Sequence, residues 1–261
     1  MSKISDAFKN GKAFIPFITG GDPSLSVTET LLFKLVEAGA DIIEIGIPFS
    51  DPTAEGPVIQ AADERALAAG CTTDKLLELV KKVRKSIKIP LLFMTYYNPI
   101  FVYGAEKFAG KCAQVGIDGL IVPDLPFEER EELLVHCEAF GVELVSMIAP
   151  TSDERTLKIA KESKGFIYCV SSLGVTGERK NIGNAAKSMI ETAKTVTDTP
   201  CAVGFGISDA AQAKEIAKFA DGVIVGSAIV KIVGQYGEQS PSHVYEFAKG
   251  IKDAVKTPCK S

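Results

Sequence analysis

Eight short apolar runs, separated by longer amphipathic stretches, restrict the fold of this chain more than any other feature of its sequence. Each run is rich in β-branched residues, as buried strands are, and the stretches between runs have the spacing of helices with one apolar face. The runs cover residues 13–19, 41–47, 90–96, 119–124, 143–149, 166–171, 201–207 and 221–226. About eight strand–helix units close a parallel barrel. We therefore expect one α/β domain over residues 1–261, a (β/α)8 TIM barrel.

An open, doubly wound sheet is the alternative arrangement of the same units. Such a sheet usually carries a glycine fingerprint of the GxGxxG type after its first strand. This chain has Gly20, Gly21 and Asp22 there, without that spacing, so the barrel is favoured. Before the first run, Ile4 and Phe8 indicate a short amphipathic N-terminal helix and not an apolar signal core.

Composition and charge argue against several classes of protein. The 261 residues carry a formal net charge of −4 with acids and bases mixed along the chain, which gives no basic stripe for nucleic acid or a membrane surface. No segment approaches the roughly 20 apolar residues of a membrane span, so a cytoplasmic protein is expected. The six cysteines include no CxxC pair, and His136 and His243 lie in helical stretches. Neither a metal site nor a disulfide framework is therefore expected, and acid–base chemistry is left to carboxylates and tyrosines.

One carboxylate interrupts the second apolar run. Glu44 lies in the middle of residues 41–47, and burying an unpaired carboxylate costs several kcal/mol or makes the group take up a proton. The loop that follows contains three prolines, a glycine and the acids Asp51 and Glu55. Active sites of α/β barrels lie at the carboxyl ends of the strands, so these acids are candidates for acid–base chemistry over a pocket. The alternatives are a salt-bridged carboxylate for Glu44 and solvated loop acids for the other two.

Glycine-bearing segments follow the last three apolar runs, at residues 174–177, 204–208 and 226–227, and the third leads into a short helical run at 228–233. Taken singly each is an ordinary turn, but backbone N–H groups at matched strand ends and at a helix start predict a phosphate site. Apolar residues near the strand ends lie between this site and the acids: Phe17, Tyr96, Ile121, Met147, Tyr168 and Phe205. Together these features favour an aromatic substrate with a phosphorylated tail.

Six segments, in order across residues 14–231, resemble the tryptophan synthase α subunit family. They are IPFITGGDP, IEIGIPFSDPTAEGPVIQ, VPDLPFEE, SSLGVTG, VGFGIS and VGSAIVK. The SDPxAxGP and GVTG motifs are the specific ones, whereas GFGIS and GSAIV also occur in similar form in other phosphate-binding barrels. The resemblance implies cleavage of indole-3-glycerol phosphate to indole and glyceraldehyde 3-phosphate, without cofactor or metal. It also implies a β subunit that receives the indole within an α2β2 complex.

The same resemblance implies roles for individual residues. Glu44 matches the general acid–base that protonates the indole ring, and Glu55 matches the loop acid that binds the indole N–H, where the family more often carries aspartate, one methylene shorter. Tyr168 matches a tyrosine beside the catalytic glutamate. The implied indole pocket comprises Phe17, Thr19, Tyr96, Ile121 and Phe205. The implied phosphate site comprises Gly177, Gly206, Gly226 and Ser227.

Two loops are expected to act as lids, one after the second strand and one over residues 172–184 after the sixth. In the family, Thr176 of the second lid contacts Asp51 of the first when both are closed, on the face where the β subunit docks. Two alternatives remain open: a free-standing lyase that releases indole, and a non-catalytic partner of the β subunit that senses glycerol phosphate. A sugar-phosphate isomerase is less favoured because no strand ends in a lysine or histidine.

Overall fold

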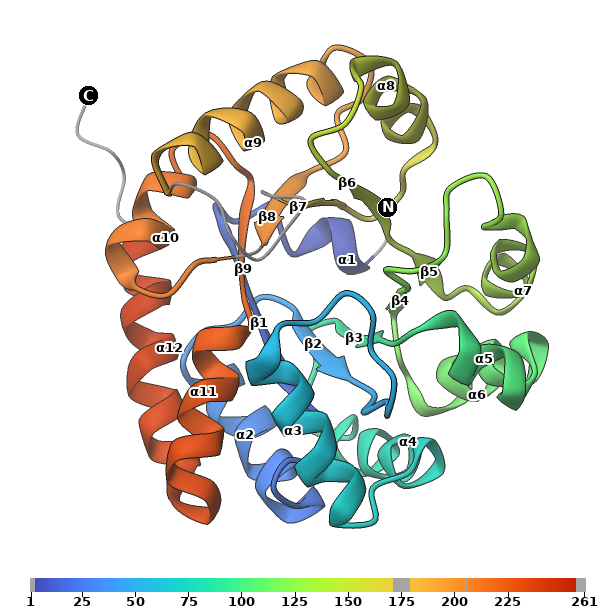
Figure 1. Cartoon of the computed structure of the whole chain (residues 1–261), viewed down its shortest axis with the longest axis vertical. Helices are drawn as coiled ribbons and strands as arrows, with labels where there is room; N and C mark the ends of the chain where they lie inside the picture. The colour runs from blue at the N-terminus through green and yellow to red at the C-terminus, as the bar shows by residue number, and fades with distance from the viewer. Residues whose placement is uncertain (1–2, 171–178, 205, 257–261) are drawn as a thin grey trace.

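The computed structural model describes residues 3–170, 179–204 and 206–256, with the side chains of 179–183 excluded, and these residues form a barrel of parallel strands wrapped by helices (Figure 1). The strands are β1 (Ala13–Thr19), β2 (Ile43–Gly46), β3 (Leu91–Met94), β4 (Gly119–Ile121), β5 (Glu143–Leu144), β6 (Ser146–Ile148), β7 (Ile167–Val170), β8 (Cys201–Gly204) and β9 (Gly222–Val225). Their order in the sheet is β5-β4-β3-β2-β1-β9-β8-β7-β6. The predicted TIM barrel is confirmed.

The fifth predicted strand is divided in two, which is why the sheet has nine strands and not eight. β5 pairs with β4 and β6 pairs with β7, with Val145 between them. Val145 still donates its backbone N–H to the Leu120 carbonyl of β4 at 2.9 Å. The first half of this segment therefore joins one side of the sheet and the second half joins the other, and the two halves together close the barrel.

Helices surround the barrel, and one of them, the short α1, lies across its amino end. They are α1 (Lys3–Asp6), α2 (Leu25–Glu37), α3 (Pro57–Ala68), α4 (Thr73–Val83), α5 (Tyr97–Tyr103), α6 (Ala105–Val115), α7 (Glu131–Phe140), α8 (Asp153–Glu162), α9 (Arg179–Lys194), α10 (Ala210–Ile216), α11 (Ser227–Tyr236), the 3-10 turn η1 (Gly237–Gln239) and α12 (Ser240–Lys256). Side-chain caps mark several starts, for example Ser24 before α2 and Asp209 before α10, each accepting a backbone N–H two residues into the helix. None of the described helices is long and apolar enough to cross a membrane.

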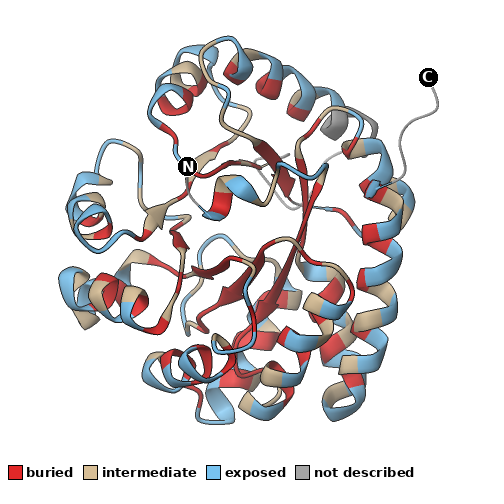
Figure 2. Cartoon of the chain, turned by 180° about the vertical axis from the view of Figure 1, so that it is seen from behind, coloured by how far each residue is buried: buried red, intermediate tan, exposed pale blue. Residues whose placement is uncertain are grey.

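Most strand residues are buried, as Figure 2 shows, whereas both residues of β5 and several of β6 and β7 are of intermediate burial. On β1, Ala13 and Ile15 point into the barrel, whereas Phe14 and Ile18 pack outward against helices. The interior cluster also contains Ile4 of α1, which is fully buried. The predicted N-terminal helix therefore closes the barrel at the amino ends of the strands, opposite the predicted site.

Candidate active site

Glu44 lies in the middle of β2 and points into the barrel. Its neighbours Ile43 and Ile45 belong to the outer core, and alternation along the strand puts Glu44 on the inner side. The residue is fully buried, and neither carboxylate oxygen has a hydrogen-bond partner among the described residues. Burial raises the pKa of this carboxyl group well above its ordinary value, which favours the protonated form. The alternative in which Glu44 forms a salt bridge is therefore not supported by the described residues.

Tyr168 points inward from β7 near this carboxyl group. Burial, followed by the negative charges of Glu44 and Glu55, raises the pKa of the phenol well above its ordinary value, so the hydroxyl stays protonated. The ring lies across Gly204 of β8: a Cβ at Gly204 would come within 2.4 Å of the Tyr168 hydroxyl oxygen. The glycine therefore makes room for the aromatic ring at this level of the barrel.

Glu55 is held over the barrel mouth by the tyrosine that ends the third strand segment. The Tyr96 hydroxyl donates to Oε2 of Glu55 and accepts the backbone N–H of Ala54 at 2.8 Å. Burial raises the pKa of Glu55, the hydrogen bond from Tyr96 opposes this, and the charge of Asp124 adds to the increase. The longer glutamate side chain thus reaches from the loop to Tyr96, and α3 begins two residues later with Pro57 at its first position.

Asp51 is exposed and accepts a hydrogen bond from the Ser50 hydroxyl. In the described residues it behaves as a solvated loop acid. Its expected partner, Thr176, lies outside the described residues, so the contact between the two lids stays a prediction.

The inner wall near the two acids is apolar. Phe17 of β1 is paired in register with Glu44, and its ring fills the space beside Gly46, where a Cβ would come within 2.6 Å of it. Ile121 of β4 is fully buried in the interior cluster. Thr19 is 2% exposed, and its hydroxyl has no hydrogen-bond partner among the described residues. Phe205, predicted for the same pocket, lies outside the described residues.

The amino end of α11 faces the mouth because this helix starts directly after β9. Gly226 precedes the helix and Ser227 is its first residue. A Cβ on Gly226 would lie 3.4 Å from the Phe17 ring, so the helix start is next to the apolar wall. Gly206 is exposed with φ +78°, a conformation that favours glycine. Gly177 lies outside the described residues, and the phosphate site as a whole stays a prediction.

Sequence reasoning missed Asp63, which lies on α3 directly beneath the loop. It is 6% exposed, and burial together with the charges of Glu55 and Asp22 raises its pKa to about 7. A signal was present in the sequence: Asp63 is four residues after the buried Ile59 and three before the buried Ala66, which puts it on the helix face that packs inward.

The two histidines lie away from the acids, as predicted. His136 is half-buried on α7, and His243 on α12 stacks on Tyr236 with ring centroids 3.7 Å apart. Among the described residues, the cysteines are all free and buried, and no group of three side chains could hold a metal ion.

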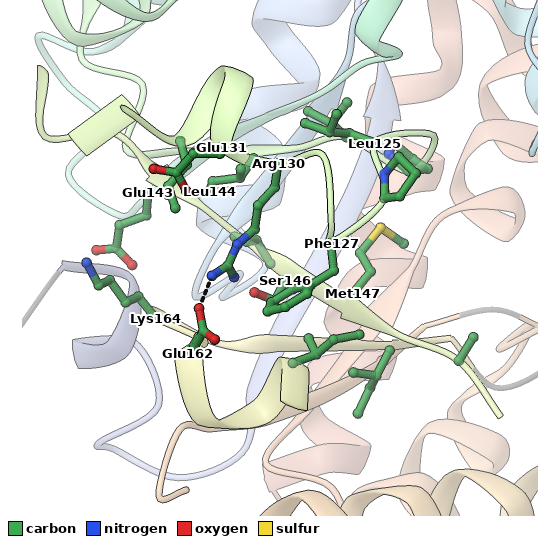
Figure 3. A pocket seen from close by; sticks show the side chains of 18 of the residues that line it. Leu125, Phe127, Arg130, Glu131, Glu143, Leu144, Ser146, Met147, Glu162 and Lys164 are labelled. Atoms are coloured by element: carbon green, nitrogen blue, oxygen red, sulfur yellow. Dashed lines mark hydrogen bonds and ion pairs between the residues drawn. The ribbon is translucent and has the colours of Figure 1, made fainter. Parts of the chain in front are cut away.

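A separate cavity of about 1050 Å³ lies between α7 and α8 (Figure 3). Its walls include Phe127 and Met147, and an ion pair between Arg130 and Glu162 crosses one side. The guanidinium of Arg130 also lies 3.9 Å from the centre of the Phe127 ring. Neither Glu44 nor Glu55 lines this cavity, so it is distinct from the space between the two acids.

Residues 4–256 match the family model described as tryptophan synthase alpha chain. The tryptophan synthase alpha chain of Lacticaseibacillus casei is 47% identical over 255 residues, covering 98% of this chain and 96% of that protein. The one from Halalkalibacterium halodurans is 50% identical over 242 residues, covering 92% and 91%. Among solved structures, tryptophan synthase subunit alpha from Legionella pneumophila has a TM-score of 0.89 at 35% identity and covers 98% of both chains. A chain from the tryptophan synthase a2b2 complex of Pyrococcus furiosus has a TM-score of 0.86 at 36% identity, covering 93% of this chain and 98% of that one.

Proposed function

This chain belongs to the tryptophan synthase alpha chain family and is a lyase of tryptophan biosynthesis, and on that premise we propose that it cleaves indole-3-glycerol phosphate to indole and glyceraldehyde 3-phosphate. The observation that carries the proposal is the carboxyl group of Glu44. It is fully buried and points into the barrel, and burial raises its pKa well above the ordinary value. A protonated carboxyl group with no hydrogen-bond partner among the described residues is a general acid available to a bound substrate.

In the first step Glu44 gives its proton to C3 of the indole ring. The ring then carries a positive charge that is shared with its nitrogen, and the carboxylate of Glu55 accepts a hydrogen bond from the ring N–H. Burial strengthens this interaction because a charge in a partly dry site is poorly screened. Tyr96 orients Glu55 for this role through its hydroxyl group.

In the second step the bond between indole C3 and the glycerol carbon breaks. The Glu44 carboxylate removes the proton from the hydroxyl group on that carbon, the carbon becomes an aldehyde, and the bonding electrons return to the ring and restore its aromaticity. Glu44 ends the cycle protonated, as it began. Its raised pKa suits both steps, since the group has to be a usable acid first and a competent base afterwards.

The phosphate group of the substrate is assigned to the amino end of α11. The first backbone N–H groups of a helix have no partner within the helix, and the helix dipole favours an anion there. Gly226 and Ser227 lie at this position, and the neighbouring Phe17 ring marks the start of the apolar wall that would contact the indole.

A β subunit is the proposed partner at the barrel mouth. The short helix α5 follows Tyr96 and exposes Phe101 and Val102, whose exposed fractions are 70% and 78%. Two apolar side chains this exposed and next to each other support a contact surface here. Docking beside Tyr96 would let the partner influence the loop that carries Glu55, which is the coupling between partner binding and turnover that we propose.

The test is indole release from indole-3-glycerol phosphate by the purified chain, with and without an added tryptophan synthase β subunit. We expect a slow rate that the β subunit raises strongly, and no indole from Glu44→Gln. Phe101→Asp should keep the slow rate and lose the increase, whereas Phe33→Asp, an exposed substitution on α2, should keep both. A fast rate without the β subunit would favour the free-standing lyase, and no indole under either condition would refute the proposal.

A further inference from the structure

Asp124 lies on the loop after β4, and the proposed mechanism makes no use of its carboxylate. The residue is exposed and follows Ile121, the last residue of β4, by three positions. Its Oδ1 accepts the backbone N–H of Tyr97 at 2.9 Å. Tyr97 is the first residue of α5 and comes directly after Tyr96, whose hydroxyl donates to Glu55. Asp124 therefore holds the backbone next to the residue that positions the loop acid.

The start of α5 is not capped by its own N-cap residue. Tyr96 occupies that position in an extended conformation, and its side chain bonds to no backbone N–H of this fully described helix. Serine, threonine, aspartate and asparagine are preferred there, because a short polar side chain can accept an N–H of the first turn. The Tyr96 hydroxyl instead donates to Glu55 and accepts the N–H of Ala54. Because this tyrosine is bonded to the loop, the acceptor for the first N–H of the helix comes from the end of a neighbouring strand.

A carboxylate is well suited to this place. The first N–H groups of a helix have no partner within the helix, and the helix dipole puts partial positive charge there. α5 has 7 residues, so its ordering depends on contacts outside the helix. A second contact comes from the Tyr97 hydroxyl, which donates to Oε2 of Glu132 on α7 at 2.9 Å. Asp124 and Glu132 thus hold the backbone and the side chain of the same residue.

The backbone is held on both sides of Tyr96. Before it, the N–H of Thr95 bonds to the carbonyl of Ile121, at the end of β4, at 3.0 Å. After it, Asp124 accepts the N–H of Tyr97. Both acceptors belong to β4 or to the loop that follows it. The position of the Tyr96 ring, and of the hydroxyl at its end, is therefore set by the end of β4.

We propose that Asp124 is a positioning residue for the cleavage reaction, which fixes the start of α5 so that the Tyr96 hydroxyl holds Glu55 in place for the indole N–H. This inference rests on the proposed function, because it concerns the placement of the acid that stabilises the charged ring. A displacement of about 1 Å is enough to weaken a contact that has to form with a defined geometry. Loss of the bond from Tyr97 to Asp124 should therefore slow the chemical step more than it weakens substrate binding.

The experiment compares wild type with Asp124→Leu and Asp124→Asn, and with Asp74→Leu as a matched control. Leucine removes the acceptor, whereas asparagine has nearly the same shape and keeps an amide oxygen that can accept the Tyr97 N–H. Asp74 on α4 accepts the hydroxyl of Tyr103, the last residue of α5, at 2.6 Å. The control therefore removes an aspartate that holds the opposite end of the same helix. Indole release is measured at a saturating concentration of the β subunit, together with thermal unfolding and hydrogen–deuterium exchange of residues 96–103.

Asp124→Leu should lower kcat about five- to thirtyfold, the size of effect that a helix-capping contact can have, and should change KM by less than about twofold. The Tyr97 amide should exchange faster in this variant. Asp124→Asn should bring kcat back to within about twofold of wild type, because the acceptor is kept. Asp74→Leu should keep kcat within about twofold of wild type and leave the exchange of the Tyr97 amide unchanged, although it too should melt at a lower temperature than wild type.

The outcomes separate the two proposals. Normal indole release by wild type, with kcat unchanged in Asp124→Leu, would overturn the role of Asp124 and leave the proposed function intact. Equal losses of kcat in Asp124→Leu and Asp74→Leu would also overturn it, because a general loosening of α5 would then be sufficient. A loss that asparagine does not restore would overturn it as well. No indole release by wild type would instead overturn the proposed function, and the exchange of the Tyr97 amide in Asp124→Leu would still decide whether Asp124 holds the start of α5.

Discussion

Tyr96→Phe removes one oxygen atom and tests the arrangement over the barrel mouth directly. The hydroxyl makes two contacts, donating to Glu55 and accepting the N–H of Ala54. The ring remains, and so does its packing on Phe49 at 5.5 Å. The substitution therefore releases the catalytic carboxylate while leaving the apolar contacts of a 5%-exposed side chain in place.

The magnitude follows from the bond to Glu55. A hydrogen bond to a charged group contributes about 1.5–3 kcal/mol, and about 1.4 kcal/mol corresponds to a factor of ten in rate. We expect kcat to fall about tenfold to a hundredfold if the bond orients Glu55 in the transition state. The hydrogen bond from Tyr96 also lowers the pKa of Glu55. Without it the carboxylate forms only at higher pH, so the acid side of the rate profile should move upward.

Steady-state indole release from pH 5.5 to 9, with the β subunit present, measures both effects. Thermal unfolding serves as the control and should change by no more than a few degrees, since only a hydroxyl group is lost. Unchanged kcat at neutral pH together with an unmoved acid limb would refute the view that Tyr96 sets the position and charge of Glu55.

Three further predictions concern the neighbouring charges. Glu44→Gln should abolish turnover yet raise the melting temperature at neutral and alkaline pH. The reason is that the pKa of this buried acid is raised, so the stability that Glu44 contributes is lost as the pH rises. A lower melting temperature of the variant at pH 8 would contradict this. Glu55→Ala should lose at least about a hundredfold in kcat, and wild-type turnover would show that the loop acid has no catalytic part. Arg65→Met should lower the free energy of unfolding, measured in urea, by about 1–3 kcal/mol, because Asp22 is 1% exposed and loses the cation that pairs with it. The cost stays below that of breaking a fully buried ion pair, because the Arg65 side chain is 37% exposed.

The fold was largely predictable because parallel strands buried on both faces leave a strong apolar signal. β1 has the predicted bounds of residues 13–19. The split between β5 and β6 was not predictable, because hydropathy does not record which neighbour a strand pairs with. The run 143–149 is apolar enough to be one strand, and only its change of pairing partner at Val145 divides it.

The candidate site was predictable where a residue breaks a pattern. Glu44 was conspicuous as a charge in an apolar run, and its burial without a partner in the described residues follows from that position. Asp63 breaks no such pattern, because an acid in an amphipathic helix is ordinarily solvated. Only the packing of α3 in the folded structure shows that Asp63 is buried. The hydrogen bond from Tyr96 to Glu55 depends on the path of the loop, and the sequence has no hydrophobic periodicity there from which that path could be predicted.

The N-terminal segment closes one end of this barrel. Ile4 of α1 and Phe8, just after it, lie at the end opposite the mouth. The interior between them and Glu44 is filled by packed side chains such as Phe166, whose ring centroid is 5.7 Å from that of Phe8. Along the barrel axis, the described residues therefore leave entry and exit at the same end. A partner bound over that end would control both the entry of substrate and the exit of indole. The released indole would then contact this partner before it reached bulk solvent.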